Sequence, residues 1–266
     1  GRGRASNCQR QVFCHEDHEE RPILSRWVAK RGVMSMLDDI EDSDEYVWSV
    51  YFTPGPLDDR NNPAMPQDWP HQPDLMTILE RVGGSETGVA IFASTNRSIA
   101  VAPPFPIDTD LVAEGANVAP LRHLLRSEPT VGVVLLRLGR YAVGVVRGDK
   151  LIASKTATRH VKNRHRAGGQ SQRRFERSRE RLIRELYDKT CEIVGDKFSP
   201  YRGSMDYVML GGERHTLDGL IIRCRRLQDL KGKTLHRLLP VDSPNRKALE
   251  GIVREVWKSR VYRIEG

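Results

Sequence analysis

The chain has 266 residues, a length that suits one or two domains with an ample hydrophobic core. Its formal net charge of +8 and sequence pI of about 9.5 favour an anionic partner such as nucleic acid. No apolar run reaches the roughly eighteen residues that mark a membrane span, and four cysteines are too few for a secreted disulfide framework. We therefore expect a protein that works in a reducing cytoplasm.

The first part of the chain, residues 1–45, reads as a polar tail followed by a helix. Cys8, Cys14, His15 and His18 cluster in the tail, but their spacing misses that of common zinc sites. The pattern favours a tail without a bound metal, and a metal site formed by these four residues stays open as the alternative. Apolar positions at helical spacing then predict a helix over 22–37, and the acidic segment 38–45 reads as a loop.

Residues 46–118 read as a smaller α/β unit. The aromatic and β-branched run 46–52 predicts a strand, and the Pro-, Asp- and Asn-rich segment 53–73 an irregular connection. Asp74 can cap a helix that extends to Val82. Two further strands are predicted over 88–93 and 98–102.

Residues 119–266 read as a second, larger unit. A short helix over 120–126 precedes three strands, 131–138, 141–146 and 150–158, whose tight glycine turns predict an antiparallel meander. A helix from about Ser171 to Val194 follows. The remainder alternates strand and helix: strand 207–211, helix 216–223, strand 235–241, helix 245–259 and a final strand 261–264. This order predicts a mixed sheet with helices packed on it.

The segment Arg159–Arg181 stands out because Gly168-Gly169-Gln170 lies between two basic arms. Two glycines allow a close approach of the backbone to a ligand, and the helix that follows presents backbone N–H groups and a positive dipole end. The arms can bind phosphates of RNA. Their candidate contacts are Arg159, Lys162, Arg164, Arg166, Arg173, Arg174, Arg177 and Arg181.

The longer string G-G-Q-S-x-x-R-F-x-R-x-R closely resembles the catalytic loop and following helix of eukaryotic and archaeal class I peptide-chain release factors. It resembles more loosely the release-factor-like peptidyl-tRNA hydrolases that rescue stalled ribosomes. The resemblance implies an RNase H-like fold for about residues 120–266. The segments V-W-S-V-Y and V-A-P-P-F-P give the first unit a vaguer similarity to the N-terminal unit of bacterial release-factor-like proteins.

The resemblance also implies a chemistry. Water attacks the ester that joins the nascent chain to the CCA end of tRNA, and the backbone N–H of Gln170 stabilises the charge on the carbonyl oxygen. Gly168 and Gly169 permit the fit. Some rescue-type relatives carry a G-x-x-Q arrangement, which Gly169 and Gln172 also satisfy, so either glutamine could hold the working position. The implied partners are the large ribosomal subunit, its RNA and peptidyl-tRNA, with no cofactor and a monomer off the ribosome.

Two departures from the full release factors change the expected substrate. The chain has no Asn-Ile-Lys-Ser motif, which reads the stop codon in those factors, and it ends after the catalytic-type unit. Both favour codon-independent release on stalled ribosomes or large subunits. Two alternatives remain open: a ribosomal-RNA or tRNA-binding factor without hydrolysis, and a metal-dependent RNase H-like nuclease. The nuclease is disfavoured because Asp149, in a turn, is the only carboxylate within 131–158.

Overall fold

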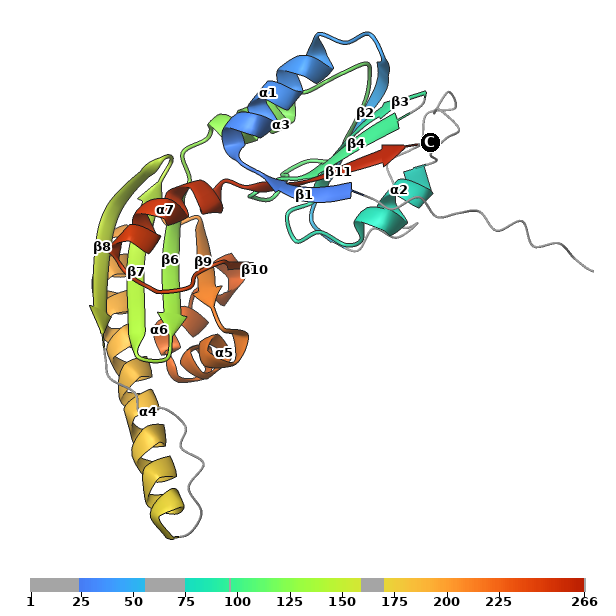
Figure 1. Cartoon of the computed structure of the whole chain (residues 1–266). Helices are drawn as coiled ribbons and strands as arrows, with labels where there is room; N and C mark the ends of the chain where they lie inside the picture. The colour runs from blue at the N-terminus through green and yellow to red at the C-terminus, as the bar shows by residue number, and fades with distance from the viewer. Residues whose placement is uncertain (1–23, 56–74, 96, 159–169, 266) are drawn as a thin grey trace, which may run out of the picture.

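The computed structural model describes residues 24–55, 75–95, 97–158 and 170–265, and its strands form two sheets (Figure 1). The first sheet has six strands in the order β1-β11-β4-β3-β2-β5, and every neighbouring pair is antiparallel. Its strands are β1 Leu24–Val28, β2 Tyr46–Phe52, β3 Val89–Ser94, β4 Arg97–Ala102, β5 Leu111–Glu114 and β11 Ser259–Glu265.

The second sheet has five strands in the order β10-β9-β6-β7-β8. β6, β7 and β8 form the expected antiparallel meander, whereas β9 is parallel to β6 and β10 is parallel to β9. This mixed sheet, with helices packed on it, confirms the α/β fold class that the sequence predicted. Its strands are β6 Thr130–Arg137, β7 Arg140–Arg147, β8 Lys150–Thr158, β9 Tyr207–Gly212 and β10 Thr234–Leu239.

The meander depends on glycine at its two turns. Gly139 and Gly148 have φ angles of 92° and 53°, in the left-handed region that other residues rarely adopt. β6 then has seven consecutive buried residues, Thr130 to Leu136, because helices cover both faces of the sheet.

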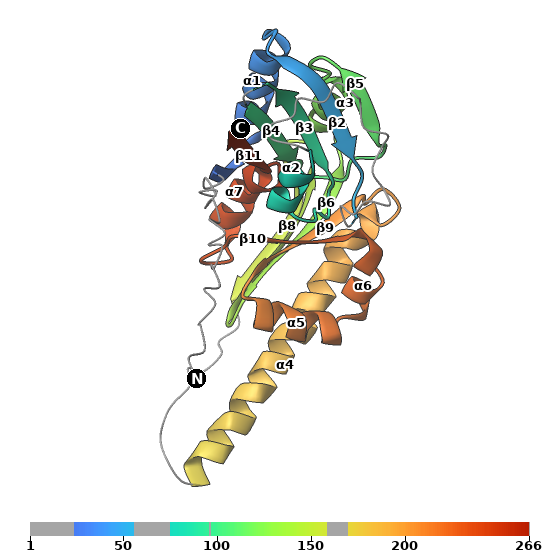
Figure 2. The ribbon, with the colours of Figure 1, turned by 90° about the vertical axis from the view of Figure 1, so that its right-hand side faces the viewer.

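Helices cover each sheet on both faces (Figures 1 and 2). α1 and α3 pack on one face of the first sheet and α2 on the other. α7 covers one face of the second sheet, and α4, α5 and α6 cover the opposite face. None of the described helices is both long and apolar enough to cross a membrane. The bounds are α1 Lys30–Glu41, α2 Leu75–Val82, α3 Ala119–Arg126, α4 Gln170–Phe198, α5 Arg214–Arg223, α6 Arg225–Gln228 and α7 Arg246–Val256, with short 3-10 turns at Ser199–Tyr201 and Lys231–Lys233.

The two ends of the chain correct the sequence prediction. The helix expected over 22–37 is wrong in its first part, because β1 occupies Leu24–Val28 and the helix α1 begins only at Lys30. The apolar spacing of this segment suits an edge strand as well as a helix. Its partner is β11, at the opposite end of the chain, so no local signal decides between them. β5 was not predicted at all.

The C-terminal strand lies in the first sheet, although the sequence placed its residues with the second unit. β11 pairs with β1 on one side and β4 on the other. The chain therefore crosses from α7 back to the first sheet, and a single hydrophobic cluster runs from α1 and α3 to α7 and the strands beneath it.

Aromatic side chains fill the junction between the two sheets. Phe105 stacks on Tyr207 with ring centroids 4.9 Å apart and meets Trp257 edge-to-face at 5.1 Å. The indole N–H of Trp257 donates to the carbonyl oxygen of Gly148 at 2.8 Å. The Glu86 carboxylate also accepts a backbone N–H from Arg237 at 2.7 Å, which ties the first unit to β10.

Candidate functional site

The basic loop connects the edge strand of the second sheet to the longest helix. β8 ends at Thr158 and α4 begins at Gln170, so the helix starts directly after the Gly-Gly pair, one residue before the predicted start. Gln170 therefore lies at the N-terminus of α4. The predicted site residues Arg159, Lys162, Arg164, Arg166, Gly168 and Gly169 lie outside the described residues.

The first half of α4 extends beyond the sheet (Figures 1 and 2). Among the α4 side chains that the structure describes, Leu186 is the first that is buried. At 1.5 Å per residue, the segment 170–185 forms an arm of about 24 Å. The arm carries its N-terminal end, and hence the attachment of the loop, well away from the hydrophobic core.

The predicted arginines of α4 are partly described. Arg174, Arg177 and Arg181 are exposed, and Arg184 joins them one turn further along. Their spacing of three and four residues places the four on one side of the helix. Gln172 and Arg173 belong to the first turn of α4, but their side chains are outside the description.

The second half of α4 is anchored in the core. Leu186, Val194 and Phe198 are buried against the second sheet. Gly132 of β6 makes this contact close, because an added Cβ would lie 2.7 Å from the Phe198 ring. The buried Thr190 hydroxyl donates to the carbonyl oxygen of Leu186 at 2.7 Å, so its polar atom is satisfied within the helix.

Two side-chain links join α4 to the corner between α5 and α6. Cys191 of α4 forms a disulfide with Cys224, whereas the small number of cysteines had favoured reduced thiols. One turn earlier, Asp188 accepts hydrogen bonds from both Nε and Nη2 of Arg223, the latter at 2.8 Å. Arg223 lowers the pKa of the Asp188 carboxyl below its usual range, chiefly through these hydrogen bonds, and Arg184 adds to the effect. The run Arg223-Cys224-Arg225-Arg226 was the available sequence signal.

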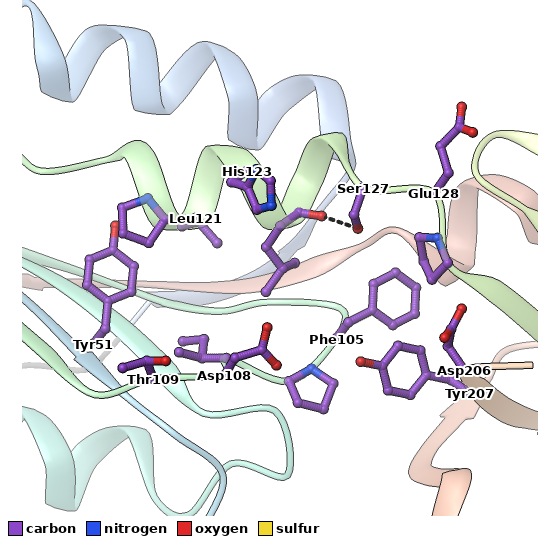
Figure 3. Close-up of a pocket in the computed structure, with 15 residues that line it drawn as sticks. Tyr51, Phe105, Asp108, Thr109, Leu121, His123, Ser127, Glu128, Asp206 and Tyr207 are labelled. Carbon is purple, nitrogen blue, oxygen red and sulfur yellow. Dashed lines mark hydrogen bonds between the residues drawn. The ribbon is translucent and has the colours of Figure 1, made fainter. Parts of the chain in front are cut away.

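A separate hollow lies at the junction of the two units (Figure 3). Its volume is about 480 Å³, and its lining comes from the segment 105–109, α3 and the start of β9. Asp108 and Asp206 line it beside Tyr207, whose pKa is raised mainly by burial and further by these two carboxylates. The elements that line it, α3 and the start of β9, lie at the opposite end of the second sheet from the N-terminus of α4 (Figure 1). The sequence did not predict this hollow.

The carboxylate that a metal-dependent nuclease would need in this sheet is part of an ion pair. Asp149, in the turn between β7 and β8, lies 3.1 Å from the Lys30 ammonium. Within the described ranges no three His, Cys, Asp or Glu side chains are grouped closely enough to hold a metal ion. The Cys8, Cys14, His15 and His18 cluster lies outside those ranges.

A family model matches most of the second unit. Residues 129–262 match the family described as Actinobacteria/chloroflexi VLRF1 release factor. Peptide chain release factor subunit 1 of Methanopyrus kandleri is 27% identical over 172 residues, which cover 60% of this chain and 42% of the relative. The protein of the same name from Archaeoglobus fulgidus is 33% identical over 97 residues, covering 36% and 24%. The chain thus spans less than half the length of these curated relatives.

Solved structures of translation factors also align. The crystal structure of an archaeal translation termination factor, aRF1, aligns with 17% identity and a TM-score of 0.40, covering 86% of this chain and 70% of that one. Dom34 of S. cerevisiae, a translation termination-like factor involved in RNA quality control, aligns with 9% identity and a TM-score of 0.28, covering 87% and 64%.

Proposed function

Because the chain belongs to the Actinobacteria/chloroflexi VLRF1 release factor family, we propose that it hydrolyses the ester of peptidyl-tRNA on stalled ribosomes or large subunits, whatever codon is present. The observation that supports this proposal is a Gly-Gly-Gln tripeptide in the sequence whose glutamine, Gln170, is the first residue of a projecting helix. An arm of this kind can bring the tripeptide to the CCA end of tRNA, deep in the large subunit. The protein would act in the cytoplasm, without a cofactor and as a monomer off the ribosome.

The proposed chemistry needs no nucleophile from the protein. Water attacks the ester carbonyl, and the backbone N–H of Gln170 stabilises the negative charge that develops on the carbonyl oxygen. The Gln170 side chain places or excludes water, and Gly168 and Gly169 let the backbone approach the ester. Gln172 is the alternative working residue if the loop binds in the G-x-x-Q register. The ribosomal active site supplies the remaining groups.

The absence of the stop-reading Asn-Ile-Lys-Ser motif from the sequence leads to the first prediction. Peptide should be released at similar rates from stalled ribosomes with a stop codon, a sense codon or no codon in the decoding site. The measurement is release of labelled peptide from matched complexes that differ only in that codon. Release confined to stop-codon complexes would contradict codon independence while leaving hydrolysis intact.

The second prediction concerns the arginines beside the tripeptide. Arg173→Ala combined with Arg177→Ala should weaken binding to ribosomes or tRNA and reduce the slope of log K against log salt by about 1.8, since each phosphate contact contributes about 0.9. The loss should not depend on RNA sequence, because phosphate contacts carry no base information. Binding titrations at several salt concentrations measure both quantities.

A matched control uses Arg246 and Arg254 of α7, on the other face of the second sheet. Arg246→Ala with Arg254→Ala makes the same change in charge at exposed positions, and should leave the affinity and the salt slope nearly unchanged. If both double variants behave alike, only net charge matters and α4 does not face RNA.

The Gln170→Ala variant separates the proposed hydrolase from a simple RNA-binding factor. A binding factor should retain its whole function in that variant. A hydrolase should bind as before and lose release.

A further inference from the structure

The exposed arginines of α4 continue into a longer line of positive charge. Arg174, Arg177, Arg181 and Arg184 follow one side of the helix. The next residues on that side, by the same spacing, are Asp188, Cys191 and Gly195. None of these three carries a positive charge, so the row of arginines on α4 ends at Arg184.

The corner between α5 and α6 places two arginines beside these positions: Arg223 neutralises Asp188, and Arg226 adds an unpaired charge. Two N–H groups of the planar Arg223 guanidinium donate hydrogen bonds to the two carboxylate oxygens of Asp188. Arg226 lies directly on the backbone of α4 at Gly195, where an added Cβ would collide with its guanidinium group. Cys191 and Cys224 meet between these two contacts, so the corner packs directly on α4.

The resulting line of guanidinium groups, which we call the arginine track, runs from Arg174 to the position of Gly195. Its members are Arg174, Arg177, Arg181, Arg184, Arg223 and Arg226. At 1.5 Å per residue, the underlying part of α4 is about 31 Å long. The track therefore extends along most of the arm and onto the body of the second unit.

Most of the positive charge of the track is not neutralised by the protein. Arg174, Arg177, Arg184 and Arg226 have no ion-pair partner among the described residues, whereas Arg223 pairs with Asp188 and Arg181 pairs with Glu185 at a long 3.7 Å. The neighbouring Glu192 pairs with Lys189 at 2.7 Å. Unpaired arginines held in a straight row attract a linear polyanion.

We infer that the arginine track binds the phosphate backbone of an RNA duplex, and thereby fixes the direction in which α4 presents the loop. The inference rests on the proposed function, in which the loop reaches the ester of peptidyl-tRNA while the track binds a duplex such as a tRNA stem. A duplex is favoured over a single strand for two reasons. Double-stranded RNA is recognised through its shape and phosphates. Single strands are held by exposed aromatic rings, and the exposed residues described over 177–184 and 223–226 include none.

The test removes two charges from the part of the track that is remote from the loop. Arg184→Gln with Arg226→Gln is compared with Arg246→Gln and Arg254→Gln, which change the net charge equally on the opposite face of the sheet. The probes are an RNA hairpin of about 16 base pairs and an unstructured single strand of the same charge. The first pair should reduce the salt slope for the hairpin by about 1.8, with a smaller effect on the single strand. The control pair should change neither.

Circular dichroism first establishes that each variant is folded. If Arg226→Gln disturbs α6, Arg177→Gln with Arg184→Gln replaces it, since both of these side chains are exposed on α4. Equal effects of the track and control pairs, or equal effects on hairpin and single strand, overturn the inference. So does tighter competition by an acidic polypeptide than by the hairpin, which would indicate a protein partner.

A Gly169→Ala variant keeps this inference distinct from the proposed function. If that variant loses release while the track pair leaves hairpin binding unchanged, the proposed function stands and the duplex contact is wrong. If the track pair weakens hairpin binding while Gly169→Ala releases peptide normally, the duplex contact stands and the assignment of the loop is wrong.

Discussion

Replacing Gly169 by Ala should reduce the rate of peptide release by about 100-fold or more, because the loss of one oxyanion donor typically costs a factor of 10²–10³. The added methyl group restricts the backbone that must bring the N–H of residue 170 to the ester. Gln170→Ala should cause a comparable loss by removing the side chain that places water. Ribosome binding should change little in both variants, since the arginines remain. Single-turnover release at saturating protein, with separate binding titrations, measures the two effects.

The chain offers a matched control for this glycine. Gly203 lies in the turn before β9, and an added Cβ there would meet nothing within 4 Å. Gly203→Ala should therefore release peptide like the wild type. Gln172→Ala tests the register: full activity of Gln170→Ala with a dead Gln172→Ala would move the working position to residue 172. Unchanged release by Gly169→Ala would remove the loop from the reaction altogether.

Replacing Trp257 by Ala should lower the free energy of unfolding by about 3–5 kcal/mol, the usual cost of removing a buried aromatic side chain. Trp257 is 2% exposed at the junction of the two units. The variant loses the edge contact with Phe105, the hydrogen bond to Gly148 and the contact with the Lys30 ammonium, which lies 3.9 Å from the ring centroid. Urea denaturation followed by far-ultraviolet circular dichroism measures the change.

Trp27 provides the comparison for Trp257. Its side chain is 50% exposed on the edge strand β1, and its described ring contact is the Arg237 guanidinium at 4.2 Å. Trp27→Ala should therefore destabilise the protein by only about 1 kcal/mol or less. If the two variants unfold at the same urea concentration, the aromatic junction is not a major source of stability, and the link between the units depends on other contacts.

The parts of the site that the sequence predicted have local causes. Gly168, Gly169 and Gln170 were recognised as a motif, and the start of α4 directly after the glycines follows from a polar, basic segment with helical periodicity. The common side of Arg177, Arg181 and Arg184 is also a consequence of the helical repeat.

The contacts between α4 and the α5–α6 corner could not be predicted from local sequence patterns. Asp188 and Arg223 are separated by 35 residues, and Cys191 and Cys224 by 33. The basic run 223–226 marks this corner as charged, but nothing in it indicates that the corner packs across α4. The position of Arg226 over Gly195 depends on the same packing.

By itself, then, the amino-acid sequence determined the meander, the helix after the loop and its arginines, because glycine turns and the helical repeat act between residues a few positions apart. Only the tertiary structure decided that β11 completes the first sheet, and that β1 is a strand instead of the start of a helix. Both depend on hydrogen bonds between segments from opposite ends of the chain. Such a pairing is selected by the backbone groups and apolar faces that each edge leaves uncovered, and these exist only once the rest of the sheet has formed.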